Sequence, residues 1–472
     1  MLLRYFDPIL RKEAHLGNWQ VISRGGGTGR VVTSADLKSV QGSDFDEPTV
    51  LVTDAVVGNE EIPEGVIAVL TPDTTDIVSH VAIRARNARL LFATCYDADT
   101  MERLKSLNGR WVKVDIDAAG QVLFGETQEM NEKKESRRAK SEQISLSRHE
   151  FTAYAVFSKD FSNKIVGGKA NNITRLQGKL ADWVTLPISV AVPFGVFEKV
   201  LGEPNNQDVA SQHEELVQRL GKTEKKEKRE KILDELRRTI LKLNAPDNLI
   251  ASLRHVMKGS GLPWPEEWEA AWTCIKQVWG SKWNERAYLS RKAMGIIHQD
   301  LYMAVLIQEV VEADYSFVIH TVNPFTGNKS EIYAEVVLGL GEALVANFPG
   351  RALSFTCKKG ARDAHILSFP SKSQGVFGGG LIFRSDSNGE DLVDYAGAGL
   401  YDSFMLPHPN KIFVDYSNES LVWEENFRKD LLVSIASIGT EVEKATRSAQ
   451  DIEGAYCKGK YYVVQTRPQV GI

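Results

Sequence analysis

The chain has 472 residues, of which 43% are hydrophobic and 25% charged, an ordinary composition for a globular protein but too long for one core, so we expect roughly two to four domains. The formal net charge of −5 argues against a nucleic-acid-binding protein, whose binding face is normally basic. No apolar stretch is long enough to span a membrane, and the four cysteines lack CxxC pairing, which indicates reduced thiols rather than disulfides or a zinc site.

Residues 1–16 mix acidic with basic side chains and show no small-residue cleavage pattern, so they do not resemble a signal peptide. We expect them to form a connecting helix from a missing upstream region. The chain would then be the C-terminal part of a longer protein, with any targeting segment upstream of residue 1.

Residues 17–125 alternate short β-rich runs with turns: WQVIS, GRVVTS, PTVLVTD, GVIAVL, RLLFATC, WVKVDID and QVLFG. Helical segments are expected at 79–88 and 98–107. This pattern predicts a compact, β-rich α/β domain.

Residues 126–150 contain few large apolar side chains and dense mixed charge, which predicts a solvated linker between two domains that move relative to each other. A second domain is expected at 151–472, with an exposed charged helix at 222–244 and mostly strands beyond residue 300. Four tryptophans at helical spacing favour core packing over a sugar-binding platform; they are Trp268, Trp272, Trp279 and Trp283.

The segment TPDTTDIVSHVAIRARN, residues 71–87, places His80 after a turn at the start of a predicted helix. Free backbone N–H groups and the helix dipole would lie beside the ring, and Arg84 shares its helical face. Such a setting suits a phosphoryl group carried on a neutral imidazole. From these residues alone, a packed structural histidine is the stronger alternative.

Two further segments place a cation beside glycines or small polar residues. In KIVGGKANNITRL, residues 164–176, two glycines precede Lys169, so the backbone could approach a phosphate closely, although the motif is not a P-loop. In FRSDSNGEDLVDYAGAGLYDS, residues 383–403, Arg384 ends a predicted strand and would clamp phosphoryl oxygens bidentately. A helix-entry turn and an ordinary surface loop are the alternatives.

Near the C-terminus, AQDIEGAYCKGKYYVVQTRPQ predicts a β-hairpin. Asp451 and Glu453 share one face of the first strand, and Gln465 and Arg467 share one face of the second. Together they would hold Mg²⁺ and neutralise polyphosphate charge. Alternating polar residues on a half-solvated hairpin are the alternative.

The run QEVVEADYSFVIHTVNP, residues 308–324, predicts a strand pair in which Glu309 to Val311 would offer a backbone edge to adenine. The run GLGEALV, with Glu342, predicts a turn that enters the same cleft. Core scaffold is the alternative for both runs.

Several of these runs together resemble the phosphohistidine dikinase family, which includes pyruvate phosphate dikinase and phosphoenolpyruvate synthase: SHVAIRAR, GGKANN…VPFGVF, RSDSNGEDL…YAGAG and DIEG…YYVVQTRP. The closer match, almost end to end, is to the C-terminal region of the α-glucan water dikinases, through DPILRK…LGNWQVIS, TPDTTDIVSHVAIRARN…FATCYD, VWGSKWNERAY and FRSDSNGEDLVDYAGAGLYDS. The histidine domain comes first here, as in the glucan enzymes. There is also no room for a pyruvate-binding barrel of about 250 residues.

The resemblance implies an α/β multidomain fold: a swivelling β/β/α phosphohistidine domain at 17–125, then an ATP-grasp-like α+β nucleotide-binding domain at 151–472. It further implies that the β-phosphate of ATP passes to His80 and the γ-phosphate to water, giving AMP and orthophosphate. Phosphorylated His80 would then phosphorylate a glucosyl hydroxyl of an α-glucan such as starch.

By motif position, Arg84 would support His80. The residues implied to bind ATP are Lys169, Arg384, Glu309, Val311, Glu342 and Arg467. Those implied to hold Mg²⁺ are Asp451, Glu453 and Gln465.

We expect an α-glucan and ATP as partners, no nucleic acid and no membrane, with a location in the plastid stroma or cytosol. The oligomeric state is left open, with a homodimer as one alternative. Alternative functions are a phosphoglucan water dikinase, a related dikinase with another acceptor, and a non-enzymatic ATP-binding module. The family also carries N-terminal starch-binding modules that are not in this sequence, which leaves glucan selection open.

Overall fold

The computed structural model describes residues 17–43, 45–58, 60–117, 120–127, 146–223, 225–346, 348–390 and 399–469, together with residues 9, 13 and 14. The chain divides into two compact units, Met1–Ala139 with Leu344–Arg351, and Lys140–Ala343 with Ala352–Val470. Most of the predicted helix at 1–16 and of the predicted linker at 126–150 lies outside the described residues.

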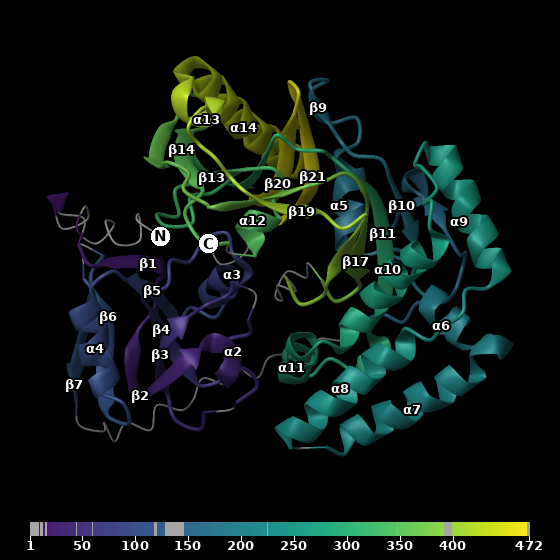
Figure 1. Ribbon diagram of the computed structural model, residues 1–472, viewed down its shortest axis with the longest axis horizontal. Coiled ribbons are helices and arrows are strands. Elements are labelled where there is room, and N and C mark those ends of the chain that lie inside the picture. The colour runs from purple at the N-terminus through teal and green to yellow at the C-terminus, as the bar shows by residue number, and fades with distance from the viewer. Residues whose placement is uncertain are drawn as a thin grey trace. The chain divides into compact units, whose positions relative to one another are not determined.

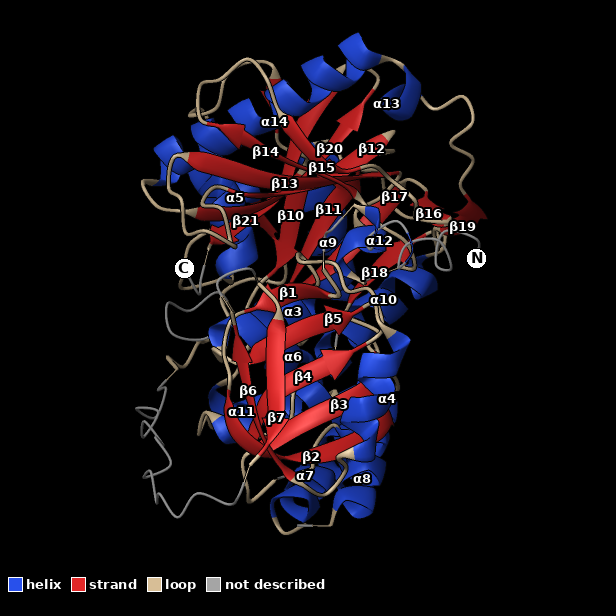
Figure 2. Ribbon diagram, turned by 90° about the vertical axis from the view of Figure 1, so that its left-hand side faces the viewer, coloured by secondary structure: helices blue, strands red, loops and turns tan. Residues whose placement is uncertain are grey.

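A mixed seven-stranded sheet forms the first unit, in the order β1-β5-β4-β3-β2-β6-β7 (Figure 2). Its three central pairs, from β2 to β5, are parallel, and the outer pairs are antiparallel. All seven predicted strands are present, as β1 (Trp19–Ser23), β2 (Gly27–Asp36), β3 (Thr49–Ala55), β4 (Val66–Thr71), β5 (Leu91–Cys95), β6 (Trp111–Ile116) and β7 (Val122–Glu126).

Helices cover both faces of this sheet, because successive side chains of a strand point to opposite faces. Val50 and Val52 of β3 belong to the apolar cluster that includes α4 (Ala98–Ser106), whereas Leu51 between them belongs to the cluster with α2 (Leu37–Val40) and α3 (His80–Asn87). Both predicted helices are confirmed, and the unit has three layers (Figure 1).

Two large β-sheets, a two-stranded sheet and two groups of helices build the described part of the second unit. The first sheet is antiparallel, in the order β18-β17-β11-β10-β8. Its strands are β8 (Val156–Phe157), β10 (Ser189–Val192), β11 (Met303–Val310), β17 (Gly380–Ser387) and β18 (Ser403–Leu406). One face packs on α6 (Val196–Leu201), α7 (Gln207–Gly221), α8 (Lys226–Ile240), α9 (Asp247–Ser260), α10 (Trp268–Gly280) and α11 (Glu285–Ala293) (Figure 1).

The second sheet has the order β15-β14-β13-β12-β20-β21-β9, and α13 (Ser420–Trp423) and α14 (Glu425–Thr446) pack on one face of it. Its strands are β9 (Val184–Thr185), β12 (Tyr315–His320), β13 (Glu331–Leu338), β14 (Leu353–Lys358), β15 (His365–Ser368), β20 (Gln450–Cys457) and β21 (Lys460–Pro468). The remaining elements are β16 (Gln374–Phe377), paired with β19 (Asn410–Phe413), the short α12 (Glu342–Val345) and four 3-10 turns. None of the helices in the described part of the chain has both the length and the hydropathy to cross a membrane.

The helix α5 (Gly168–Leu176) packs on both sheets of the second unit. Its Ala170 belongs to an apolar cluster with Ala191 and Leu306 of the five-stranded sheet, and its Ile173 and Leu176 belong to the core of the seven-stranded sheet. The helix that follows the predicted Gly-Gly-Lys turn therefore fixes one sheet against the other.

Two expectations differ from the structure. Residues 308–324 do contain two strands, β11 and β12, but the predicted pairing between them is wrong, because each belongs to a different sheet. The long helix α14 was not predicted, although the helical spacing of its buried Leu431, Ile435, Ile438 and Val442 is a signal that could have found it. Core packing of the tryptophans is confirmed for Trp272, Trp279 and Trp283, each 2% exposed.

A β-bulge in the β20–β21 hairpin decides which side chains share a face. Glu453 lies opposite Gln465, but Gly454 pairs with Val463, so that Val464 is the extra residue. An extra residue reverses the facing of the side chains that follow it. The bulge thus turns the polar end of β21 to the same face as the two carboxylates of β20, and the predicted hairpin is confirmed.

Replacing Gly454 with alanine should destabilise the second unit. A Cβ atom there would overlap the buried Phe317 ring and lie 2.7 Å from the Tyr462 carbonyl oxygen, and overpacking of this kind typically costs about 1–3 kcal/mol. Thermal unfolding followed by circular dichroism should show a lower midpoint for Gly454→Ala. Gly221→Ala is the control, because its Cβ would meet nothing within 4 Å; equal midpoints for the two variants would contradict the prediction.

Candidate functional site

His80 is the first residue of α3 and follows the carboxyl end of β4, a parallel strand. Ser79 caps the helix: its Oγ accepts a hydrogen bond from the Ala82 N–H at 3.4 Å and donates to the Asp76 carbonyl at 2.7 Å. The His80 residue is half-buried, and its Nδ1 atom is buried. The residue as a whole is therefore only partly buried.

The N–H groups of Val81 and Ala82 at the start of α3 already have acceptors, so the prediction of free N–H groups beside the ring is wrong for these two. The Val81 N–H donates to the Gly58 carbonyl at 2.8 Å, and the Ile83 N–H donates to the Ser79 carbonyl at 3.1 Å. The loop that precedes β4 thus closes the helix start. The helix dipole still favours negative charge beside His80.

Arg84 is buried, with 8% of its side chain exposed, and it contacts the loop beside His80. Its Nη1 donates to the Glu60 carbonyl at 2.6 Å, and its Nε forms an ion pair with Glu61 at 3.2 Å. The Glu60 carboxylate in turn accepts the N–H groups of Val57 and Gly58 at 2.6 and 2.7 Å. Arg84 therefore holds the loop that closes the start of α3, an indirect form of the predicted support.

In the second unit, Lys169 lies against the end of β17. Its Nζ donates to the Ser385 carbonyl at 2.8 Å and to the Ser385 Oγ at 3.0 Å. It also forms an ion pair with Glu390 at 2.7 Å, in which 14% and 3% of the two side chains are exposed. A phosphate would have to replace at least one of these acceptors.

The start of α5 binds a carboxylate of the chain itself. Asp386 accepts the N–H groups of Gly167 at 2.8 Å, Lys169 at 2.9 Å and Ala170 at 3.4 Å. A Cβ on Gly167 would lie 2.6 Å from Asp386 Oδ1 and 2.7 Å from the Ser387 carbonyl oxygen. The close backbone approach predicted for the glycines is therefore present at Gly167, but the group approached is the end of β17.

Arg384, on β17, reaches from the five-stranded sheet to the seven-stranded sheet. Its Nη1 donates to Gln308 Oε1 and to the Val464 carbonyl, both at 3.3 Å. Its Nη2 contacts Glu453 Oε2 at 3.3 Å and makes a short hydrogen bond to Gln465 Oε1. The same hairpin holds a second arginine, Arg467, whose Nε and Nη2 donate to Asp451 Oδ2 at 2.9 and 2.6 Å.

Three segments far apart in the sequence therefore converge. Ser385 and Asp386, which contact Lys169 and the start of α5, directly follow Arg384, which contacts the β20–β21 hairpin. The structure thus brings together Lys169, Arg384, Arg467, Asp451, Glu453 and Gln465 through contacts shared with β17 or within the hairpin. Among the described residues, no group of three or more His, Cys, Asp or Glu side chains is arranged as a metal site.

Glu309, Val311 and Glu342 lie apart from these contacts: within the described chain, no hydrogen bond or ion pair joins them to the six residues above. The Glu309 N–H is already used, because it donates to the Ile188 carbonyl at 3.0 Å, and the Val311 carbonyl accepts the Ala313 N–H at 2.8 Å. Both residues lie where the chain leaves the five-stranded sheet for the other. Glu342 begins α12.

Sequence reasoning did not single out Gln308, Asp386 or Glu390. Asp386 and Glu390 stand within the same motif as Arg384, so acidic residues next to the arginine were a usable signal. No pattern in the sequence points to Gln308, because its role depends on β11 lying beside β17. Residues 391–398 of that motif lie outside the described residues.

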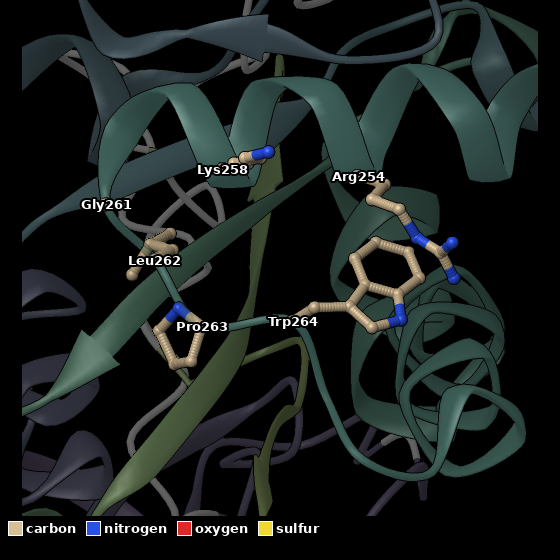
Figure 3. Close-up of a pocket in the computed structure, with 6 residues that line it drawn as sticks. All are labelled: Arg254, Lys258, Gly261, Leu262, Pro263 and Trp264. Carbon is tan, nitrogen blue, oxygen red and sulfur yellow. The ribbon is translucent and has the colours of Figure 1, made fainter.

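A shallow pocket of about 450 Å³ lies on α9 and the loop after it (Figure 3), lined by Arg254, Lys258, Gly261, Leu262, Pro263 and Trp264. The Arg254 guanidinium lies 4.6 Å from the centre of the Trp264 ring, which also stacks on Trp268. No predicted site residue lines this pocket, and we assign it no part in the reaction.

Replacing Asp386 with asparagine should change how stability depends on pH. Burial, reinforced by Glu390, raises the pKa of the Asp386 carboxyl from 3.8 to about 7, against the opposing effect of Lys169. The folded chain therefore holds this proton more tightly than the unfolded chain, so the group's contribution to stability is lost as the pH rises from about 4 to about 7. Asparagine carries no such penalty.

Urea unfolding at pH 5 and pH 8 would measure this. The free energy of unfolding of Asp386→Asn, relative to the wild type, should rise by about 1 kcal/mol or more between the two pH values, since one pKa unit corresponds to about 1.4 kcal/mol. An identical pH dependence for the two proteins would contradict the raised pKa.

Known proteins resemble this chain over its whole length. Residues 18–134 match the family model of the α-glucan water dikinase, phosphohistidine-like domain, and residues 264–349 match that of the pyruvate phosphate dikinase, AMP/ATP-binding domain. The chain is 47% identical to the chloroplastic α-glucan water dikinase of Citrus reticulata, covering 100% of this chain and 32% of that protein. It is 46% identical to α-glucan water dikinase 1 of Arabidopsis thaliana, covering 99% of this chain and 34% of that protein.

A more distant relative is the phosphoenolpyruvate synthase of Pyrococcus furiosus, which is 27% identical over 41% of this chain and 21% of that protein. The chain spans about a third of the length of the α-glucan water dikinases that it matches. The resemblance predicted from the sequence is confirmed, and the chain is similar in sequence, over essentially all of its own length, to about a third of each of the α-glucan water dikinases that it matches.

Proposed function

We propose that the chain is the catalytic region of an α-glucan water dikinase, which transfers the β-phosphate of ATP through His80 to a glucosyl hydroxyl of an α-glucan. The observation that carries this proposal is the 46–47% identity to α-glucan water dikinases over essentially the whole chain. The half-buried His80 at the start of α3 supplies the residue that such a transfer requires.

The first unit would act as the swivelling phosphohistidine domain and the second as the ATP-grasp-like nucleotide-binding domain, with boundaries near 17–125 and 151–472. The division into two compact units supports movement of one against the other. The family-model match at 18–134 supports the assignment of the first unit. The two sheets of the second unit, which Arg384 joins, support a nucleotide site there.

The phosphoryl group would be carried on Nε2 of His80, because Nδ1 is buried. A neutral imidazole is a nucleophile, and covalent capture divides the transfer into two steps. The N-terminal end of the α3 dipole would stabilise the negative charge of the phosphoryl group. Arg84 would act indirectly, by holding the loop that closes the helix start.

Lys169, Arg384 and Arg467 would bind the phosphates of ATP. Their charges would neutralise the oxygens of the group in transfer, which needs positioning and charge neutralisation more than acid–base catalysis. The segment from Glu309 to Val311 would lie along the adenine. Glu342 would belong to the same cleft, although the contacts of the described chain supply no separate support for it.

Asp451, Glu453 and Gln465 would hold Mg²⁺. Two carboxylates and an amide oxygen on neighbouring strands suit this ion, which prefers oxygen ligands and keeps several water molecules. When bound, the ion would supply positive charge that neutralises the phosphate oxygens. The hairpin contributes by fixing the donors on one face through its bulge.

In the first step, the bond between the α- and β-phosphates and that between the β- and γ-phosphates both break, and ATP, His80 and water give AMP, orthophosphate and phosphorylated His80. In the second step, a glucosyl hydroxyl takes the phosphoryl group, loses its proton and restores His80. We place this activity in the plastid stroma or cytosol; the Citrus and Arabidopsis relatives named above are chloroplastic.

Incubation with ATP labelled at the β-phosphate should place acid-labile label on the wild-type protein. His80→Ala should lose at least about 99% of this label because no other group carries the phosphoryl intermediate. His365→Ala, at an exposed histidine on β15, should keep the label and serves as the control. Retention of label by His80→Ala would contradict the proposal, and ATP binding without AMP formation would favour a non-enzymatic module.

Labelled protein freed of ATP should pass its label to solubilised amylopectin. Loss of label from the protein should match its gain by the polymer, because the second step is a direct transfer. Phosphorylated amylopectin and small hydroxyl compounds are the comparison acceptors. If label passed only to phosphorylated amylopectin, the chain would belong to a phosphoglucan water dikinase. If it passed only to a small hydroxyl compound, the chain would belong to another dikinase.

A further inference from the structure

The three residues proposed to hold Mg²⁺, Asp451, Glu453 and Gln465, also bind Arg384 and Arg467. Asp451 Oδ2 accepts two hydrogen bonds from Arg467, at 2.9 and 2.6 Å. Glu453 and Gln465 both contact the Nη2 atom of Arg384. Each proposed phosphate-binding arginine is thus paired with a proposed metal donor.

These pairs are well shielded from water. The exposed fractions of the side chains are 13% and 8% for Arg467 and Asp451, and 12% and 26% for Arg384 and Glu453. Leaving one member of such a pair without an opposite charge is costly in a poorly hydrated setting. The pairs will therefore persist until another ion replaces a partner.

Each arginine contacts one oxygen of its carboxylate, Asp451 Oδ2 or Glu453 Oε2, and a metal ion on either carboxylate would repel that arginine and weaken the ion pair, since both are cations. A phosphate and a carboxylate likewise compete for the same guanidinium N–H groups. If Glu453 and Gln465 bound a metal, Arg384 would still keep two contacts. Its Nη1 donates to Gln308 Oε1 and to the Val464 carbonyl.

We propose that these ion pairs weaken the binding of either ligand alone, and that divalent metal and polyphosphate bind with positive coupling because each releases the partner that the other needs. This inference rests on the proposed function for the identity of the two ligands. Metal would draw Asp451, Glu453 and Gln465 away from the arginines, and phosphate would draw Arg384 and Arg467 away from the donors. Such coupling is reciprocal by thermodynamic necessity.

Removing an arginine should therefore improve metal binding in the absence of nucleotide. Mn²⁺, which also prefers carboxylate oxygens, is the probe, and the free ion is measured by electron paramagnetic resonance. Arg467→Gln should bind Mn²⁺ about tenfold more tightly than the wild type, toward the low end of typical coupling between sites. Arg384→Gln should shift the affinity in the same direction.

Lys359→Gln is the matched control. Lys359 forms a 2.5 Å ion pair with Glu443 in the same unit, with 18% and 24% of the side chains exposed, and its loss should leave the Mn²⁺ affinity unchanged. Unchanged or weaker Mn²⁺ binding by both arginine variants would overturn the proposal. Circular dichroism shows which variants are folded, and the second arginine keeps the test decisive if one is not.

The converse test uses tripolyphosphate with a chelator present, followed by calorimetry. Asp451→Asn should bind this metal-free anion about tenfold more tightly than the wild type, because Arg467 is released; equal or weaker binding would overturn the proposal. Neither assay involves phosphoryl transfer. A chain that shows this coupling but never labels His80 from ATP would refute the proposed function alone, and the reverse result would refute only the coupling.

Discussion

The contact of Arg384 with the β20–β21 hairpin is the interaction on which the architecture of the second unit depends. A guanidinium on one sheet is held by a carboxylate, an amide and a carbonyl of the other, so two sheets with separate apolar cores meet at a charged group. Both Nη atoms of Arg384 have acceptors, which offset the cost of burying the charge, whereas its buried Nε has no hydrogen-bond partner among the described residues. Because a buried guanidinium without acceptors would be unstable, the residues that flank Arg384 must keep the positions that supply those acceptors.

The constraint extends in two directions from β17. Toward α5, Asp386 and Glu390 bind the helix start and Lys169, and Gly167 must lack a Cβ for the helix to come so close. Toward the hairpin, the bulge after Glu453 aligns both strands' polar residues on one face. In the first unit, a buried arginine has a comparable role: Arg84 anchors the loop that closes the start of the helix of His80.

Local patterns were enough to predict the strands and the two longer helices of the first unit, because its strands are short apolar runs bounded by turns and its helices start at recognisable turns. The hairpin and its shared face were also predictable, since period-two spacing fixes facing within a strand. Which side chains of the two strands share a face also depends on the β-bulge, and no residue pattern in the sequence predicts that bulge. The pairing of β11 and β12 was mispredicted because adjacency in sequence does not decide which sheet receives a strand.

The cations of the proposed nucleotide site were predictable from the sequence, but the ion pairs and hydrogen bonds that they form within the chain were not. The sequence shows Lys169, Arg384 and Arg467 near glycines and polar residues, a setting that indicates phosphate binding. Their internal partners are contributed by residues far away in the sequence, such as Glu390 for Lys169, so only the folded chain reveals the pairing. The prediction of free N–H groups beside His80 was wrong for the same reason. The Gly58 carbonyl, which accepts the Val81 N–H, belongs to a loop that lies far from His80 in the sequence.

The proposed dikinase reaction requires that His80 carry the β-phosphate of ATP while the γ-phosphate leaves as orthophosphate. Parallel incubations of the wild-type chain with ATP labelled at the β- or at the γ-phosphate distinguish this reaction from that of an ordinary kinase. We expect acid-labile label on the protein from the β-labelled nucleotide alone, with the γ-label recovered as orthophosphate. Label on the protein from the γ-labelled nucleotide would describe an ordinary kinase and would contradict the dikinase reaction.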